Sequence, residues 1–199
     1  MTVDRARAAA AVAEFLAAMG EDPGRPALAA TAARVAELGA ERFAGVGVDP
    51  VPDLAAAAVA DVSAVGPVAF RGVPFVSTCE HHLLPFAGTA AIVYRPGGTV
   101  AGFGALAGVV ETLAARPQVQ ERLTDDIADA VERGLTAAGV LVVLTAEHDC
   151  VALRGRRLPG TSVVTLAARG DYEDGPARAE ALALAGEPGD RSAPRPPRD

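Results

Sequence analysis

The two cysteines and three histidines of this chain all fall in two short clusters that lie far apart in the sequence. Cys79, His81 and His82 lie in the first cluster, and His148 and Cys150 lie in the second. Zinc prefers thiolate sulfur and imidazole nitrogen, and a catalytic zinc site has three protein ligands and one position for water. A fold that uses the two clusters together must bring these distant segments side by side.

These five residues can supply both a metal site and proton carriers. Cys79, His82 and Cys150 would fill the three ligand positions, which leaves His81 and His148 free to move protons near neutral pH. The alternative is that the cysteines are small buried hydrophobic residues and that each histidine is an ordinary surface or core residue. The confinement of all five to two clusters favours the metal site.

The charge and composition of the chain exclude several classes of function. A net charge of -7, an aromatic content of 4% and the absence of tryptophan argue against a nucleic-acid partner. All 18 basic residues are arginine. Without lysine, the chain itself can form no Schiff base and no lysine contact to a phosphate.

The length and the N-terminal residues indicate where the protein works. A chain of 199 residues is expected to form one domain, or one domain with an appendage. We find no uncharged apolar run of transmembrane length, and the alanine-rich N-terminal stretch contains Glu14, unlike a signal peptide. We therefore expect a cytoplasmic protein without a membrane partner, whose cysteines are reduced.

The spacing of apolar residues predicts helices and strands. Helices are expected over residues 3–19, 27–44, 104–115, 119–138 and 176–185, and strands over residues 68–76, 87–94, 140–145 and 163–168. Gly72 is expected to interrupt the first strand, and Gly139 to cap the helix before it. Residues 49–66 stay ambiguous, with a short helix over 54–60 as one interpretation.

This order of elements indicates an α+β fold. From about residue 66 to about residue 170 it reads strand, strand, helix, helix, strand, strand, which suits a small antiparallel sheet with two helices on one face. The other face of such a sheet needs burial by something else, and a partner subunit is the natural candidate.

Three sequence blocks resemble the signature of the GTP cyclohydrolase I family. They are CEHHLLPF at residues 79–86, RPQVQERLT at residues 116–124 and HDCVALRG at residues 148–155. Weaker similarity runs from Glu21 through residues 31–36 and on to residues 172–174. The resemblance covers roughly residues 12 to 185, and the three blocks in this order are highly specific.

The resemblance implies a fold and an assembly. The implied fold is the tunnelling fold, an α+β fold with a four-stranded antiparallel sheet, two helices on one face and preceding N-terminal helices. Residues 1–48 would form the N-terminal helical region, residues 49–185 the catalytic domain, and residues 186–199 a disordered tail. Members of the family form toroidal homo-oligomers with active sites at subunit interfaces, so one chain alone would not complete the pocket.

The resemblance also implies a reaction and its machinery. Such an enzyme is a zinc-dependent hydrolase acting on cyclic amidine C–N bonds. It opens the imidazole ring of GTP to give formate and 7,8-dihydroneopterin triphosphate, for tetrahydrofolate biosynthesis and one-carbon metabolism. The matching Zn²⁺ ligands are Cys79, His82 and Cys150, and the matching proton-transfer residues are His81 and His148.

The substrate contacts follow from the same resemblance. Glu121, with Gln120 beside it, matches the position that reads guanine, because a carboxylate accepting from N1–H and the 2-amino group would stay unpaired against adenine. From the residues alone, Glu121 is an acidic side chain in the first turn of a helix, where such groups are favoured anyway. Arg34 and Arg154 match positions that contact phosphate.

One segment departs from the family pattern. Gly104, Ala105 and Gly108 stand where the family usually has Ser, Lys and Arg for the triphosphate. A hydrogen bond to a charged group contributes about 1.5–3 kcal/mol, so the loss of two would weaken binding by about two to four powers of ten. Three arginines near the third block offer compensation: Arg156, Arg157 and Arg169.

This departure leaves three hypotheses open. The first is a GTP cyclohydrolase I-like enzyme. The second is a diverged cyclohydrolase acting on a less phosphorylated purine compound. The third is a non-catalytic zinc-binding relative, against which the retention of His81 and His148 speaks.

Overall fold

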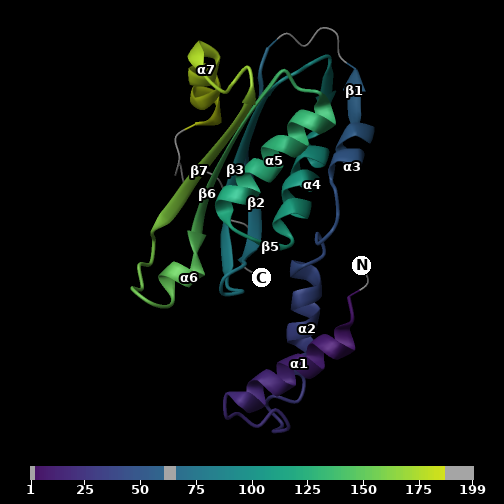
Figure 1. Cartoon of the computed structure of the whole chain (residues 1–199), viewed down its shortest axis with the longest axis vertical. Helices are drawn as coiled ribbons and strands as arrows, with labels where there is room; N and C mark the ends of the chain where they lie inside the picture. Colours follow the sequence, from purple (N-terminus) through teal and green to yellow (C-terminus); the bar gives the residue numbers. More distant parts are fainter. Residues whose placement is uncertain (1–2, 61–65, 187–199) are drawn as a thin grey trace.

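The computed structural model describes residues 3–60 and 66–186, and it shows a sheet domain from which two N-terminal helices project (Figure 1). These helices, α1 (Arg5–Ala18) and α2 (Thr31–Arg42), pack against each other. Both confirm helices predicted from the sequence, with shorter bounds. Of the predicted tail only Gly186 is described, and the rest lies outside the described residues.

The sheet has five strands in the order β5-β2-β3-β6-β7. The four long strands are antiparallel neighbours, and β5 runs parallel to the end of β2. The expected four-stranded sheet is therefore corrected to five strands, because the two residues of β5 are too few to show a strand period. The bounds are β2 (Val68–Cys79), β3 (Pro85–Arg95), β5 (Pro117–Gln118), β6 (Gly139–His148) and β7 (Ser162–Gly170).

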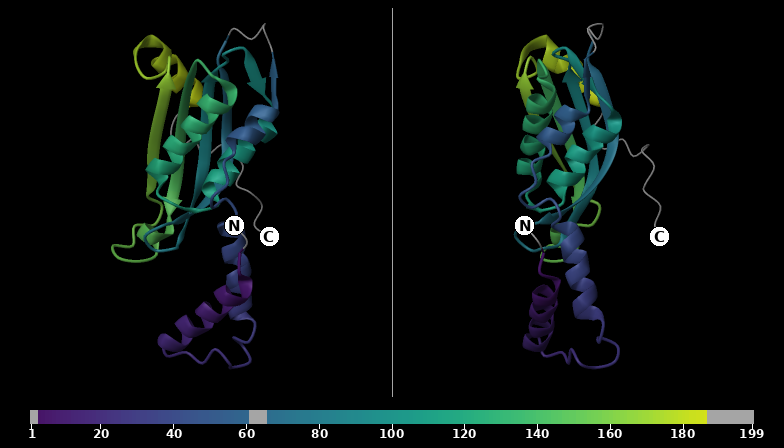
Figure 2. Two further views of the ribbon diagram at one scale, coloured as in Figure 1. Left: turned by 45° about the vertical axis from the view of Figure 1, so that its right-hand side comes forward. Right: turned by 90° about the vertical axis from the view of Figure 1, so that its right-hand side faces the viewer.

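Two helices cover one face of this sheet, as the sequence predicted (Figure 1, Figure 2). They are α4 (Phe103–Ala114), which lies against β2, and α5 (Gln120–Leu135), which lies against β6 and β7. The apolar side chains of α5 recur every three or four residues and are at most 1% exposed: Leu123, Ile127, Val131 and Leu135. Their burial against the strands is part of the main core and fixes the start of α5 at one end of the sheet.

Within residues 3–60 and 66–186, the opposite face of the sheet is covered at one end only. There α7 (Gly175–Ala185) packs Ala181 near Val93 and Leu141 of the sheet, with Tyr172 in the same cluster. Apolar side chains on the same face but outside this cluster stay exposed, such as Val164 at 44%. The expectation that a partner subunit buries the rest of this face stays a prediction.

Small elements complete the chain. The ambiguous segment 49–66 forms α3 (Val51–Ala56) and β1 (Ala58–Ala60), which pairs with β4 (Thr99–Ala101), while residues 61–65 lie outside the described residues. A one-turn helix, α6 (Asp149–Ala152), follows β6 directly and was not predicted. No helix among residues 3–60 and 66–186 combines the length and apolar character needed to cross a membrane.

Two glycines predicted to be structural breaks behave differently. Gly72 has φ 71° and marks a register shift between β2 and β3, so β2 is bulged and not broken. Gly139 does not cap α5, and that prediction is wrong. The helix ends at Leu135 with Thr136 in the left-handed region at φ 47°, and Gly139 instead begins β6 in close approach to Asp171.

We predict that Gly88→Ala weakens the fold while Gly39→Ala does not. A Cβ atom on Gly88 of β3 would overlap the carbonyl oxygen of Thr145 on β6, whereas a Cβ on Gly39 of α2 meets no atom within 4 Å. Overpacking costs about 1–3 kcal/mol, and Gly to Ala in a helix gains up to about 1 kcal/mol. Urea unfolding midpoints measure both changes, and equal midpoints for the two variants would contradict the close β3–β6 approach.

Candidate functional site

The first Cys/His cluster lies in the tight turn between β2 and β3. Cys79 ends β2, its N–H donates to the carbonyl of Leu84 at 2.8 Å, and its carbonyl accepts from Leu83 N–H at 2.8 Å. Leu83 takes the left-handed backbone conformation at φ 55° to close this turn. The turn thereby folds His82 back over the end of its own strand, with its Nδ1 3.8 Å from the sulfur of Cys79.

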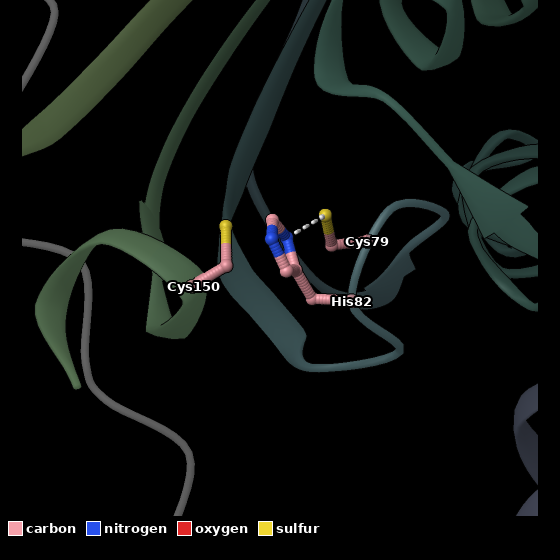
Figure 3. Close-up of side chains that lie close together, drawn as sticks. All are labelled: Cys79, His82 and Cys150. Atoms are coloured by element: carbon pink, nitrogen blue, oxygen red, sulfur yellow. Dashed lines mark hydrogen bonds between the residues drawn. The ribbon is translucent and has the colours of Figure 1, made fainter. Parts of the chain in front are cut away.

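The second cluster reaches the first through the pairing of β3 with β6. Phe86 at the start of β3 pairs with His148 at the end of β6. The chain then enters α6 at once, so that Cys150 lies in the first turn of this short helix. The ligand atoms of Cys79, His82 and Cys150 all lie within 4.8 Å of one another, with the imidazole between the two sulfur atoms (Figure 3).

The chemistry of these three side chains suits a metal ion. Two sulfurs and one imidazole nitrogen are a three-ligand set typical of catalytic zinc, and they leave one position for water. Cys79 is buried and Cys150 half-buried. Burial, together with the neighbouring Cys79 thiol, raises the pKa of Cys150 above its usual value. A bound cation would offset both effects, because it favours the thiolate form.

His148 stands beside this cluster in a defined position. Its ring is stacked on Phe86, with the centroids 4.7 Å apart and the planes 2° from parallel. Its Nε2 lies 2.7 Å from Oε1 of Gln120. Burial lowers the pKa of His148 below its usual value, and the charge of Glu121 opposes that shift. At neutral pH the ring is therefore held largely neutral and can accept a proton.

His81 and Glu121 are placed differently from His148. The His81 side chain is 64% exposed, and its Nε2 lies 3.7 Å from a carboxylate oxygen of Glu80. Glu121 is exposed in the first turn of α5. His81 lies in the turn that holds Cys79 and His82, and Glu121 lies close enough to His148 for its charge to affect the pKa of that ring.

A network fixes the start of α5 against the turn that holds Cys79. The Glu80 N–H donates to the carbonyl of Gln118 at 3.0 Å, and the Glu80 carboxylate pairs with Arg122. Arg122 Nε also donates to Oε1 of Gln118 at 2.8 Å. Neither Glu80 nor Arg122 was singled out from the sequence, although both lie inside the motif blocks that drew attention to their neighbours.

The arginines expected to bind phosphate lie in three different settings. Arg154 Nη1 is 2.8 Å from Nε2 of His82, so this guanidinium adjoins the cluster. Arg34 is exposed on α2, in the helical pair that projects from the sheet domain. Arg169, one of the three compensating candidates, is bonded to Asp125 and Asp129. Arg156 and Arg157 are exposed in the segment between α6 and β7.

Two of the three divergent positions lie at the far end of α4 from the cluster, and the third, Gly108, lies near the middle of the helix. Gly104 and Ala105 fall in the first turn of α4, next to β4, whereas the last turn leads into β5 beside Cys79 (Figure 1). At about 3.6 residues per turn, more than two turns of α4 separate Gly104 and Ala105 from the end of the helix that leads to β5. These positions therefore do not face the cluster of their own chain.

Comparison with known proteins shows the family to which this chain belongs. Residues 8–186 match the family described as GTP cyclohydrolase I. The GTP cyclohydrolase 1 of Leifsonia xyli subsp. xyli is 55% identical over 183 residues, which are 92% of this chain and 96% of that protein. That of Mycolicibacterium vanbaalenii is 50% identical over 184 residues, 91% and 90% of the two chains. That of Rhodopirellula baltica is 49% identical over 183 residues, 92% and 79%.

We predict that His82→Gln loses a bound metal ion and that the matched neighbour His81→Gln keeps it. Among the histidines that the structure describes, His82 is the one whose ring nitrogen lies within 4.8 Å of both thiol sulfurs. Removing a group that merely orients a ligand costs about 10–100-fold in metal affinity, so removing a ligand costs more than about 100-fold. Dialysis of both variants against Zn²⁺, followed by elemental analysis, gives the metal content per chain. Equal metal content in the two variants would rule out this ligand set.

Proposed function

Because the chain belongs to the GTP cyclohydrolase I family, we propose that it opens the imidazole ring of GTP to give formate and 7,8-dihydroneopterin triphosphate. The observation that carries this proposal is the convergence of Cys79, His82 and Cys150 beside the half-buried His148. Such a hydrolase supplies a pterin for tetrahydrofolate biosynthesis. The purine nucleotide is its small-molecule partner.

We assign Cys79, His82 and Cys150 to hold a Zn²⁺ ion, because two thiolates and one imidazole fit that ion better than the oxygen-seeking Mg²⁺ or Ca²⁺. When bound, Zn²⁺ lowers the pKa of water towards 7 and so supplies a nucleophile for the C8 carbon of guanine. Leaving one ligand position open is what separates such a site from a purely structural one.

We assign proton transfer beside the cluster to the side chain of His148. Its ring is stacked on Phe86 and hydrogen-bonded at Nε2 to Gln120, so the directions of its two nitrogen atoms are fixed. Burial keeps it neutral and ready to accept a proton. His81, which lies on the solvent side next to Glu80, can exchange protons with water and is the second proton carrier.

Glu121 is assigned to guanine recognition. Its carboxylate is exposed at the start of α5, close enough to His148 for its charge to affect that ring. A carboxylate there can accept from N1–H and the 2-amino group of guanine at once. Adenine lacks that donor pair, so it would leave a charged group unpaired.

The site of one chain is open, and we propose that a second chain completes it. The family fold is the tunnelling fold, and the partly uncovered sheet face with Val164 is the surface that suits a subunit contact. The divergent end of α4, with Gly104 and Ala105, faces away from its own cluster and would meet the site of another chain. The phosphate contacts would then come from Arg154 of one chain and Arg34 of the next.

A second candidate is the same ring opening on a purine compound with fewer phosphates. It is favoured by the loss of cations at Ala105 and Gly108 and of a hydroxyl group at Gly104, with open space around both glycines. It is also favoured by Arg169, whose guanidinium is bonded to Asp125 and Asp129 and so does not compensate. A triphosphate would therefore meet fewer cations than the motif pattern alone suggests.

The proposed activity is tested by incubating zinc-loaded protein with GTP and measuring formate together with the fluorescent pterin formed on oxidation. We expect product from the natural chain. We expect kcat/KM to fall by about 10–100-fold in Glu121→Gln, because a charged acceptor is worth about 1.5–3 kcal/mol. The charge-matched control is Glu111→Gln, at an exposed position on α4, and this change should leave kcat/KM nearly unaltered. No product at high enzyme concentration would refute the proposal.

The two substrate hypotheses are separated by comparing GTP, GMP and guanosine. If the cation losses at Ala105 and Gly108 are uncompensated, kcat/KM for GMP should come within about tenfold of that for GTP, since each lost charged contact costs about one to two powers of ten. Restoring charge with Ala105→Lys should then favour GTP. A strong preference of the natural chain for the triphosphate would eliminate the second candidate.

A further inference from the structure

The side chain of Gln120 is buried, and its polar atoms are bonded within the protein. The residue is 1% exposed at the start of α5. Its Nε2 donates to the carbonyls of Leu144 at 3.2 Å and Val163 at 3.0 Å, and to the hydroxyl of Thr165 at 3.1 Å. Its Oε1 faces Nε2 of His148 at 2.7 Å.

Those partners leave one orientation of the amide. Main-chain carbonyls only accept hydrogen bonds. If the amide were flipped, its oxygen would face the carbonyl oxygens of Leu144 and Val163 with no proton between them. The NH₂ group must therefore point towards β6 and β7, and the amide oxygen must point towards His148.

The hydroxyl groups nearby agree with this orientation. The Thr124 hydroxyl donates its only proton to the main-chain carbonyl of Gln120, at 2.7 Å. The 2.6 Å contact between Thr124 and Thr165 then requires Thr165 to be the donor. Thr165 Oγ1 is left to accept from Gln120 Nε2, whose two protons are shared among three acceptors, so the directions of these hydrogen bonds are consistent.

The orientation of the amide dictates which nitrogen of His148 carries a proton. Oε1 of Gln120 can only accept, so Nε2 of His148 must donate to it. We propose that Gln120 is a positioning residue that fixes the tautomer of His148, so that Nε2 carries the proton and the free lone pair lies on Nδ1. This inference deepens the proposed function, on which its catalytic part rests.

The inference changes the role expected for Gln120. The sequence resemblance placed Gln120 with Glu121 among the substrate contacts. In the structure the two neighbours point to different surroundings, Glu121 to solvent and Gln120 into the core. A neutral imidazole whose tautomer is fixed presents a base in one direction only, and the stacking of His148 on Phe86 holds that direction.

The tautomer is measured directly by ¹⁵N NMR of histidine-labelled, zinc-loaded full-length protein. The chain has three histidines, and comparison with His148→Phe assigns the signals of His148. At about pH 8, above the ordinary imidazole pKa of about 6.5, we expect a proton bonded to Nε2 and none on Nδ1. A proton on Nδ1 of the natural protein would overturn the inference without the need for any variant.

Variants separate positioning from a general structural effect. Gln120→Met keeps the side-chain length but removes both the acceptor and the donors, so both tautomers of His148 should become populated. Gln118→Met is the matched control, because Gln118 is an equally buried glutamine bonded to Asp126 and Arg122 and not to His148. It should leave the tautomer unchanged. An unchanged tautomer in Gln120→Met would overturn the inference.

Kinetics test the catalytic part. Proton transfer by a positioned side chain contributes about 10²–10⁴-fold, so Gln120→Met should lower kcat with GTP by about 10–100-fold and leave KM within about twofold. A rise in KM with unchanged kcat would instead make Gln120 a substrate contact and overturn the inference. If the natural protein forms no product from GTP, the proposed function fails, while the NMR result still decides whether Gln120 fixes the tautomer.

Discussion

The pairing of β3 with β6 is the interaction on which the rest of the site depends. The ladder runs from Arg95 opposite Gly139 to Phe86 opposite His148, through strands whose inward side chains are buried. A shift of one residue in this register would turn every side chain to the other face. Because the core fixes the register, it also fixes where the two Cys/His clusters meet. The metal-binding geometry is in this sense a consequence of packing among apolar residues remote from it.

Helix α5 connects that packing to the chemistry. Its apolar stripe rests on the strands, and its first turn divides its side chains between two surroundings. Gln120 and Thr124 face the sheet and bond to β6 and β7, while Glu121 faces solvent. The short strand β5 places this first turn next to Cys79. The proposed recognition of the base and the proposed orientation of the proton carrier would thus both depend on one helix start, which the core holds in place.

Much of this could be predicted from the sequence, and what could not has a physical reason. The apolar strand at residues 140–145 and the stripe of α5 are local patterns, and the two clusters are visible as motifs. The two-residue β5 and the left-handed end of α5 at Thr136 leave no periodic signal. The bonds of Gln120 join residues that lie far apart in the chain, from Leu144 to Thr165. No motif could give the orientation of its amide, because that orientation depends on carbonyls which only the folded sheet brings near.

The charges around the cluster bear on how a phosphorylated substrate is held. Among the described residues near it, Arg122 is paired with Glu80, and Arg154 lies on His82. When His82 binds a metal through Nδ1, its Nε2 carries a proton and no longer accepts from Arg154. That guanidinium is then free to turn towards an anion. Metal binding and phosphate binding would be coupled through one histidine, and Arg156 and Arg157, exposed between α6 and β7, are further cations of this chain.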